Sequence, residues 1–343
     1  MKIYIIIIAY NGSQYIKKCL ASVFLSKYSG QFNVVAVDNH SLDNTVEIIE
    51  KEFPQVELIK LEKNLGFVGG NNIGIKRALV SGAGYVVLLN QDTEVEYDWL
   101  TQLVKAAQDD KVGIVQAMLL LANERALTNN VGNAMHYLGF GFVKNYRERV
   151  DSWYHRPPFA IGYASGAAML IKKEVLQTLT LPSPWKGEGT AYLNPVFFMY
   201  HEDLDLCWRA RLAGYEIMIA PQATVYHHYE FNRNKKMFYW TERNRWAVLL
   251  QNYSLVTLLK LSPILLFIEI AMLGYSLISG WFVYKLQSYG WIIINLPGIF
   301  KTRIKTQSMR KVGDSEVMKH MDSALSFPKF INPLLKKYWQ YVR

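Results

Sequence analysis

Acidic side chains at two places in the sequence have the types and spacing that a metal-assisted transfer reaction requires. The first place follows the apolar run 85–89, which ends in Asn90-Gln91-Asp92. Five apolar residues in a row predict a strand that is buried on both faces. A carboxylate in the loop after such a strand can hold a hard cation and the diphosphate that the cation bridges. A simple turn, or the cap of the next helix, is the alternative.

The second place is the acidic start of a predicted helix. Glu202-Asp203-Leu204-Asp205 follows an aromatic stretch, and the helix is expected to stop at Gly214. A helix that begins at a cleft directs its first-turn side chains into it, which makes Asp203 the candidate general base. Asp205 is expected to pair with Arg209 on the helix surface, because the two are four residues apart. Carboxylates that merely complement the helix dipole are the alternative.

Two histidines, His227 and His228, stand at the end of a further predicted strand. A histidine in this position can complete a metal site begun by Asp92. An ordinary hydrogen-bonded histidine is the alternative, and the sequence leaves open which of the two would be the ligand.

Strands and helices alternate along the first half of the chain, which predicts a mostly parallel α/β sheet with right-handed crossovers. Ser13 is expected to cap the first helix. Small residues at 164–168 precede an apolar strand and permit the close approach of a ligand. Residues 122–160 are expected to cover the site. The predicted strands are 3–9, 32–37, 56–61, 85–89 and 113–121, and the predicted helices run from 13 to about 23, from 41 to 51, from about 72 to 80 and from 99 to 108.

Polar residues follow three of these strands, and each could bind one part of a nucleotide. Asp38 can accept a hydrogen bond from a base or a ribose hydroxyl, while Asn11 and the loop Gly69-Gly70-Asn71 can bring backbone amides close to phosphates. A capped turn at Asp38 and a plain glycine turn are the alternatives. The glycines do not follow the Gly-x-Gly-x-x-Gly pattern, which argues against a dinucleotide dehydrogenase.

Composition narrows the class of protein. The chain of 343 residues is 51% hydrophobic and 14% aromatic, which excludes a disordered protein. The formal charge of +10 suits an anionic membrane surface or substrate, and a nucleic-acid binder is disfavoured because no reading motif accompanies the charge. Cys19 and Cys207 are expected to be buried thiols in helices. The apolar N-terminus resembles a signal peptide, but its apolar run is short and no small-residue cleavage site follows. It is therefore expected to form the first strand of the sheet.

Taken in order, these motifs resemble family 2 glycosyltransferases of the GT-A fold, in the bacterial rhamnosyltransferase-like branch. The resemblance covers roughly residues 1–250. It rests on 9–11, 37–39, 64–67, 69–72, 89–93, 165–167, 202–206 and 225–227. It departs from the family at the Asp-x-Asp metal motif, whose first carboxylate is replaced by Asn90. A single carboxylate would leave the metal more dependent on the diphosphate and on His227.

The resemblance implies a role for each matching residue. Asp38 would bind the base, Asp92 would hold Mg²⁺ or Mn²⁺ with His227 as a further ligand, and Asp203 would deprotonate the acceptor. The nucleotide sugar would contact Ala9, Tyr10, Asn11, Asp38, Asn39, Asn64, Gly70, Asn71, Asn90, Gln91, Gly166 and Glu202.

One base and no second nucleophile imply a single displacement with inversion at the anomeric carbon. We expect the donor to be dTDP-rhamnose, with galactofuranose, glucose or N-acetylglucosamine as alternative sugars, and the acceptor to be a lipid-linked or cell-envelope glycan. A non-catalytic nucleotide-sugar-binding assembly partner is the competing interpretation, and the replacement at Asn90 is its only support.

The composition changes after residue 250. Residues 1–250 are therefore expected to form the catalytic domain, with a nucleotide-binding half (1–121) and an acceptor half (122–250), and residues 251–343 a membrane-associated helical region. The stretch 261–284 is apolar except for Glu269 and is long enough to span a bilayer. A single crossing would place the basic tail outside, against the positive-inside tendency. We therefore expect two interfacial helices, 255–285 and 291–303, on the cytoplasmic face of the membrane. A layer packed on the catalytic domain, or on a second subunit in a homo-oligomer, is the alternative.

Overall fold

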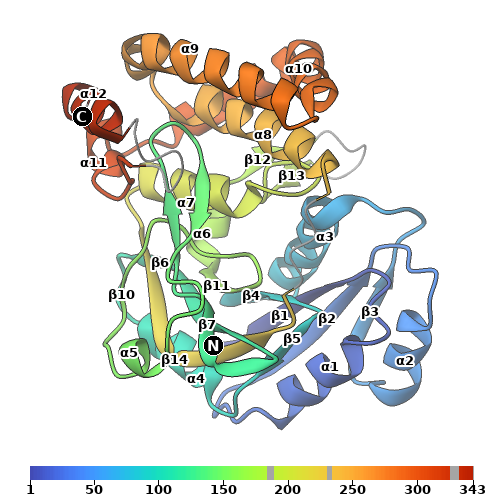
Figure 1. Cartoon of the computed structure of the whole chain (residues 1–343). Coiled ribbons are helices and arrows are strands. Elements are labelled where there is room, and N and C mark those ends of the chain that lie inside the picture. Colours follow the sequence, from blue (N-terminus) through green and yellow to red (C-terminus); the bar gives the residue numbers. More distant parts are fainter. Residues whose placement is uncertain (184–188, 230–233, 325–331, 343) are drawn as a thin grey trace.

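The computed structural model describes residues 1–183, 189–229, 234–324 and 332–342, and a twisted sheet flanked by helices forms its centre (Figure 1). The strands of this sheet are β1 (Ile3–Ala9), β2 (Phe32–Asp38), β3 (Glu57–Lys60), β4 (Tyr85–Asn90), β5 (Thr93–Val95), β6 (Val112–Leu121), β7 (Glu124–Asn130), β10 (Phe159–Ala160), β11 (Ala168–Lys172) and β14 (Glu216–His227). Their order is β10-β14-β6-β11-β4-β1-β2-β3, with β5 paired to β14 and β7 paired to β6. Two short hairpins, β8 (Asn133–Met135) with β9 (Gly141–Val143) and β12 (Leu181–Pro182) with β13 (Thr190–Ala191), lie outside it.

The pairing confirms the mostly parallel sheet. Strands β4, β1, β2 and β3 are parallel neighbours, and β6 is parallel to β14. Strand β11 lies between β4 and β6 and is antiparallel to both, so that β4 and β6 point the same way. The carboxyl ends of β1, β2, β4 and β14 therefore meet at one edge of the sheet, where ligands bind in open α/β folds.

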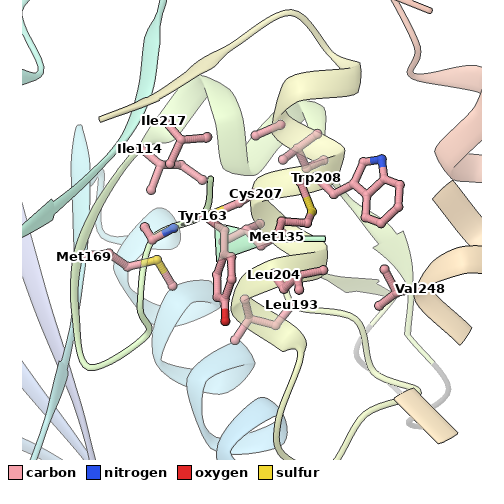
Figure 2. Close-up of a cluster of buried hydrophobic side chains, with 14 of the residues drawn as sticks. Ile114, Met135, Tyr163, Met169, Leu193, Leu204, Cys207, Trp208, Ile217 and Val248 are labelled. Carbon is pink, nitrogen blue, oxygen red and sulfur yellow. Dashed lines mark hydrogen bonds between the residues drawn. The ribbon is translucent and has the colours of Figure 1, made fainter. Parts of the chain in front are cut away.

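Each face of the sheet has its own hydrophobic core, because alternate residues of a strand point to opposite faces. Ile3, Ile5 and Ile7 of β1 pack under α1 (Ile16–Leu25), α2 (Thr45–Glu52) and α4 (Trp99–Ala106). Tyr4 and Ile6 face the other core, covered by α3 (Gly66–Val80), α6 (Lys173–Thr178) and α7 (Glu202–Leu212). Figure 2 shows the centre of this second core, which gathers Ile114, Met135, Tyr163, Met169, Leu193, Leu204, Cys207, Trp208, Ile217 and Val248.

The predicted glycine loop at 69–71 is wrong, because residues 66–80 form the helix α3. The glycines let this helix lie close to β1. A side chain at Gly70 would meet Ile8 at 3.1 Å, and one at Gly74 would meet Ile6 at 2.3 Å. The glycine pattern thus serves the packing of a helix on a sheet.

Three smaller expectations have mixed outcomes. Ser13 does not cap the first helix, because α1 begins at Ile16 and the Ser13 amide donates to Asp43 Oδ2 at 3.0 Å. Asp205 and Arg209 do pair, at 2.8 Å, but both side chains are fully buried, because α7 is covered by other elements on all sides. Cys19 and Cys207 are buried and free, which confirms the prediction for them.

Helices α8 (Lys236–Asn252), α9 (Leu255–Ile278), α10 (Phe282–Ser308), α11 (Asp314–Met318) and α12 (Asn332–Val342) form the C-terminal layer, and α5 (Asp151–Tyr154) lies at the opposite end of the molecule (Figure 1). The two predicted C-terminal helices exist, but the break lies at 279–281 and not between 285 and 291. Of the described residues, α9 alone forms a helix that length and apolar composition would allow to cross a membrane. The boundary at residue 250 falls inside α8, and the division into domains stays a prediction.

Four buried charges connect α8, α9 and α10. Arg245 Nη2 of α8 lies 2.8 Å from Glu269 Oε2 of α9, and Lys285 of α10 pairs with both Glu269 and Glu242. Burial raises the pKa of Glu242, but the charges of Arg245 and Lys285 outweigh it and lower this pKa to about 2. Glu269, the one charge in the predicted apolar span, therefore faces the protein and holds α9 against its neighbours.

Candidate functional site

A cavity of about 350 Å³ opens at the carboxyl ends of β1, β2 and β4, where the sequence predicted the site. Its walls come from these strand ends, from the start of α3 and from the segment before α7. The lining residues are Ile8, Tyr10, Asn39, Asn64, Gly66, Phe67, Asn90, Gln91, Asp92, Phe198 and Met199. Six predicted site residues are among them: Tyr10, Asn39, Asn64, Asn90, Gln91 and Asp92.

A reciprocal pair of hydrogen bonds joins the loops after β1 and β4. The Tyr10 amide donates to Gln91 Oε1 at 3.0 Å, and Gln91 Nε2 donates to the Tyr10 carbonyl at 2.9 Å. Any side chain at Gly12 would meet Gln91 Oε1 at 2.0 Å. Gln91 therefore fixes the spacing of the two loops, and Gly12 makes room for it.

Three asparagines that were predicted to bind the nucleotide sugar make hydrogen bonds within the protein. Asn11, with a φ of 45°, accepts from the Leu42 amide at 2.8 Å. Asn39 donates to the Gly66 carbonyl at 3.0 Å and accepts from the Leu65 amide at 2.8 Å. Asn64 accepts from the Gly66 amide at 2.7 Å. Asn39 ties the start of α3 to the end of β2, Asn64 bonds locally at that start, and Asn11 ties the loop after β1 to the segment after β2.

Asp38, Gly70, Asn71 and Ala9 lie outside the cavity lining. Asp38 is buried, and its carboxylate accepts from the Ser41 amide at 3.2 and 3.3 Å, as in the alternative of a capped turn. Asn71 is buried and donates to the Phe67 carbonyl at 2.9 Å, one turn earlier in α3. Gly70 lies against Ile8, and Ala9 is fully buried in β1. The structure thus gives Gly70 and Asn71 packing roles in a helix.

Asp92 and His227 lie side by side although 135 positions separate them in the sequence. His227 Nε2 is 3.4 Å from Asp92 Oδ1. The other ring nitrogen, Nδ1, is 3.1 Å from Asn129 Oδ1. The tautomer that donates from Nδ1 to Asn129 leaves the Nε2 lone pair facing Asp92. His228 has a different partner, since its Nε2 lies 2.8 Å from Glu94 Oε1. This geometry favours His227 of the two histidines.

Asp203 stands in the first turn of α7, beside the cavity wall. Its carboxylate accepts from the Leu204 amide at 2.7 Å and from the Gly166 amide at 3.3 Å. A side chain at Gly166 would meet the Phe67 ring, which lines the cavity, at 3.2 Å, and Asp203 Cβ at 3.9 Å. Burial raises the pKa of Asp203 to about 6 against these amide hydrogen bonds.

Glu202 is buried, and its Oε2 atom has no hydrogen-bond partner among the described residues. Burial and the neighbouring charge of Asp203 raise the pKa of Glu202 to about 8. Both carboxyl pKa values are thus raised above their ordinary range, and that of Glu202 is raised further than that of Asp203. Raised carboxyl pKa values in a cleft are characteristic of catalytic groups.

Five residues of the cavity lining and one polar support were not predicted as site residues. The five are Ile8, Gly66, Phe67, Phe198 and Met199. The aromatic run before Glu202 was a signal for Phe198 and Met199. Asn129 orients His227 from β7, and nothing in its local sequence points to that contact.

A comparison with models of protein families shows the family to which this chain belongs. The model of the glycosyl transferase family 2 matches residues 4–179, just over half of the chain. The chain belongs to glycosyl transferase family 2. The family model covers β1 to α6, including the Asp92 loop and Gly166. The family is confirmed, and its rhamnosyltransferase-like branch stays a prediction.

Relatives of known description are distant. The low-salt glycan biosynthesis hexosyltransferase Agl10 of Haloferax volcanii is 26% identical over 208 residues, covering 60% of this chain and 61% of that protein. The poly-beta-1,6-N-acetyl-D-glucosamine synthase of Staphylococcus epidermidis is 26% identical over 276 residues, covering 78% of this chain and 60% of that protein. The chain thus spans less than two thirds of either relative. The activity of this chain is therefore inferred from its family 2 glycosyl transferase domain, and these relatives show what that domain is similar to.

Solved structures show the same fold. TarS 1–349 of S. aureus in complex with UDP superposes with a TM-score of 0.51 at 17% identity, covering 100% of this chain and 90% of that one. GalNAc-T7 with UDP, GalNAc and Mn²⁺ gives 0.56 at 15% identity, covering 73% and 48%. The mannosyltransferase PcManGT from Pyrobaculum calidifontis, in complex with GDP-Man and Mn²⁺, gives 0.51 at 13% identity, covering 99% and 85%. These likenesses confirm the GT-A fold.

Proposed function

We propose that this glycosyltransferase moves a sugar from a nucleotide diphosphate donor to a hydroxyl of a lipid-linked or cell-envelope glycan, with inversion at the anomeric carbon. The observation that carries the proposal is that Asp203 accepts a hydrogen bond from Gly166, which lies against Phe67 of the cavity that Asp92 also lines. A metal-binding carboxylate and a base at one cavity are the two groups that a single displacement needs. The complexes of the structural neighbours with UDP and with GDP-Man support a nucleotide donor.

Asp92 and His227 would hold the cation. A carboxylate oxygen and an imidazole nitrogen 3.4 Å apart are spaced to bind one ion together, and Asn129 lies at the other ring nitrogen, where it would accept from the required tautomer. No third histidine, cysteine, aspartate or glutamate joins them within the described residues. Diphosphate oxygens and water must complete the shell, which is typical of Mg²⁺ and also suits Mn²⁺. When bound, the ion supplies Lewis-acid stabilisation of the leaving diphosphate.

Asp203 takes the proton of the acceptor. As the acceptor oxygen forms its bond to the anomeric carbon, the bond from that carbon to the diphosphate oxygen breaks, and the proton passes to the Asp203 carboxylate. The nucleoside diphosphate leaves with the electron pair of the broken bond. The Leu204 and Gly166 amides orient the carboxylate for this transfer. Asp38 keeps free acceptor capacity for a base N–H, since both its oxygens contact one amide only.

Large apolar side chains on α9 and α10 are exposed and define the outer surface of the C-terminal layer. They are Leu255, Val256, Leu259, Leu266, Phe267, Ile270, Leu277, Ile278, Val283, Leu286, Ile293, Ile294, Phe300 and Ile304. Exposed Lys260, Lys301 and Lys305 accompany them. An apolar surface with basic residues suits the interface of an anionic membrane. The proposed location is therefore peripheral, on the cytoplasmic face, where the nucleotide sugar and a lipid-linked acceptor meet.

The donor remains to be identified by experiment. Purified protein in detergent is mixed with Mn²⁺ and a panel of nucleotide sugars, and donor hydrolysis and thermal shift are measured. The motifs of the rhamnosyltransferase-like branch make dTDP-rhamnose the first donor to test, followed by the UDP forms of galactofuranose, glucose and N-acetylglucosamine. Stabilisation by one donor together with slow hydrolysis is expected. Stabilisation without any turnover, even with glycan acceptors, would instead favour a non-catalytic binding partner.

A further inference from the structure

The segment that brings Asp203 to the cavity contains a strained turn. Tyr200 and His201 have φ values of 67° and 65°, both in the left-handed region, where residues other than glycine lose energy. Met199 on one side of this turn lines the cavity, and Glu202 and Asp203 begin α7 on the other. Two successive strained residues persist only where the surroundings hold them.

Asn244 of α8 is the group that holds this turn. Its side chain is fully buried, and Nδ2 donates to the Met199 carbonyl at 2.9 Å and to the Tyr200 carbonyl at 2.8 Å. Its Oδ1 accepts from Arg243 Nε at 3.1 Å. Two carbonyls can only accept, so the amide nitrogen must face them, and both of its hydrogens are used. An aspartate of the same shape could make neither bond.

The far side of the turn also rests on α8. His201 Nε2 lies 3.3 Å from the Gly139 carbonyl. Gly139, with a φ of 82°, is pressed against this helix, since a side chain there would meet Arg245 Cγ and Leu249 Cγ at 3.0 Å each. Trp240 of α8 stacks on Phe198, a cavity residue, with ring centroids 5.0 Å apart. The wall of the cavity and the start of α7 thus share one support.

Helix α8 is itself fixed by the buried charges of the C-terminal layer. Arg245, the next residue after Asn244, contacts Glu242 at 3.1 Å and Glu269 at 2.8 Å, and Lys285 joins both carboxylates. Charge is balanced, with two carboxylates and two cations, which a buried cluster requires. Among the described residues that line the cavity, none belongs to this buried cluster or is Asn244 itself.

We propose that Asn244 is a positioning residue for catalysis: its amide holds the Tyr200–His201 turn so that the Asp203 carboxylate meets the acceptor hydroxyl. The inference rests on the proposed function of Asp203 as the base. The proposed cation and diphosphate contacts come from another segment, because Gln91 and Asp92 belong to the loop after β4 and not to this turn.

The test compares Asn244→Asp and Asn244→Ala with the wild-type full-length enzyme. We expect kcat to fall about 10²-fold, the cost of a misplacement near 1 Å, with the donor affinity measured by calorimetry unchanged. In the folded wild-type enzyme, burial raises the pKa of Asp203 to about 6. If the turn relaxes toward solvent, the carboxylate is less buried and its pKa falls. The acidic limb of the kcat–pH profile is therefore expected to move to lower pH, with Glu202 as the neighbouring group that titrates above it.

Gln251→Ala is the matched control, because Gln251 is a fully buried amide on the same helix that accepts from Asn194 and does not touch the turn. It is expected to lower the melting temperature while the pH profile stays in place. Wild-type kcat in both Asn244 variants, or a loss that follows the folded fraction without a shifted limb, would overturn the proposal. If Asp203→Asn is fully active, the proposed function itself fails, and this outcome is separate from a failure at Asn244.

Discussion

His227 Nε2 and Asp92 Oδ1 lie 3.4 Å apart, and the His227 ring is oriented from behind by Asn129 Oδ1, 3.1 Å from Nδ1. The two residues come from β14 and from the loop after β4, which meet because β5 pairs with β14. The contact thus joins segments that lie far apart in the sequence. The proposed cation site would have these two protein ligands, with Asn129 behind the imidazole ring.

Removal of the Asp92 carboxylate should abolish metal-dependent nucleotide binding. Calorimetric titration of the donor nucleotide into wild type is expected to show tight binding with Mn²⁺ and weak binding with EDTA. Asp92→Ala should bind weakly under both conditions, and His227→Ala should lose about 10-fold or more of the metal effect. His228→Ala is the control, since its partner is Glu94. Equal affinity in all variants, with and without metal, would contradict the cation site.

Asp203→Asn should abolish transfer without weakening donor binding. Asparagine keeps the size and accepts one of the two amide hydrogen bonds but cannot take the proton. Loss of about 10²–10⁴-fold in kcat is expected, the usual contribution of a general base. An unchanged donor affinity would show that the group acts mainly in the transition state. Near-normal transfer by this variant, with loss in Glu202→Gln or Asp205→Asn, would mean that the base is a neighbour.

The rate should fall as pH drops through about 6, because the raised pKa of Asp203 makes its carboxylate protonated and unable to accept a proton below that value. A kcat–pH profile of the wild-type enzyme measures this limb. A rate that is flat from pH 5 to pH 8 would contradict a base with this pKa.

Glu202→Gln should keep transfer at pH 7, because glutamine resembles the neutral acid present there. A carboxyl whose folded pKa, about 8, exceeds its ordinary 4.5 stabilises the fold below 4.5 and loses that contribution as pH rises through 8. Glutamine never ionises. The melting temperature of the variant relative to wild type is therefore expected to be higher at pH 9 than at pH 5. A constant difference across this range would show that Glu202 does not titrate in the fold.

Glu269→Ala should destabilise the protein strongly. The substitution leaves Arg245 and Lys285 buried with one carboxylate between them, and breaking a buried ion cluster costs about 3–5 kcal/mol. Urea unfolding measures the free energy. Glu316→Ala is the control, since its ion pair with Lys319 is half exposed and should cost less than about 1 kcal/mol. Similar losses in the two variants would show that the cluster does not hold the layer together.

The outer surface of α9 and α10 should bind anionic vesicles. Ile270→Asp and Ile294→Asp are each expected to weaken binding to phosphatidylglycerol vesicles about tenfold, because a buried isoleucine contributes roughly 1.5–3 kcal/mol. Val80→Asp on α3, also strongly exposed, should have no effect. Cysteines placed at Lys236 and Lys311 should both stay shielded from an impermeant thiol reagent in intact cells. Labelling at one of them alone would show a crossing, and a changed oligomeric state would show a subunit interface.

The sequence was sufficient for the sheet and for the edge that carries the site. Its apolar runs and alternating helices are local signals, and the ends of parallel strands must meet at one edge. The strand-end position placed the loop Asn90-Gln91-Asp92 at the cavity, and the family resemblance added Tyr10. The acidic start of α7 was also predicted from a local signal, because carboxylates are favoured in the first turn of a helix.

Tertiary packing decided what each polar residue touches. Gly70 and Asn71 form the underside of a helix because α3 lies against β1, and a glycine motif read along the chain does not show that approach. Arg209 and Asp205 are buried, and Glu269 turns inward, because neighbours more than 15 residues away in the sequence enclose them. Local spacing determines the secondary structure and the strand ends. Burial, the choice of His227 over His228 and the support of Asp203 by Asn244 depend on contacts between distant segments, which only the folded chain brings together.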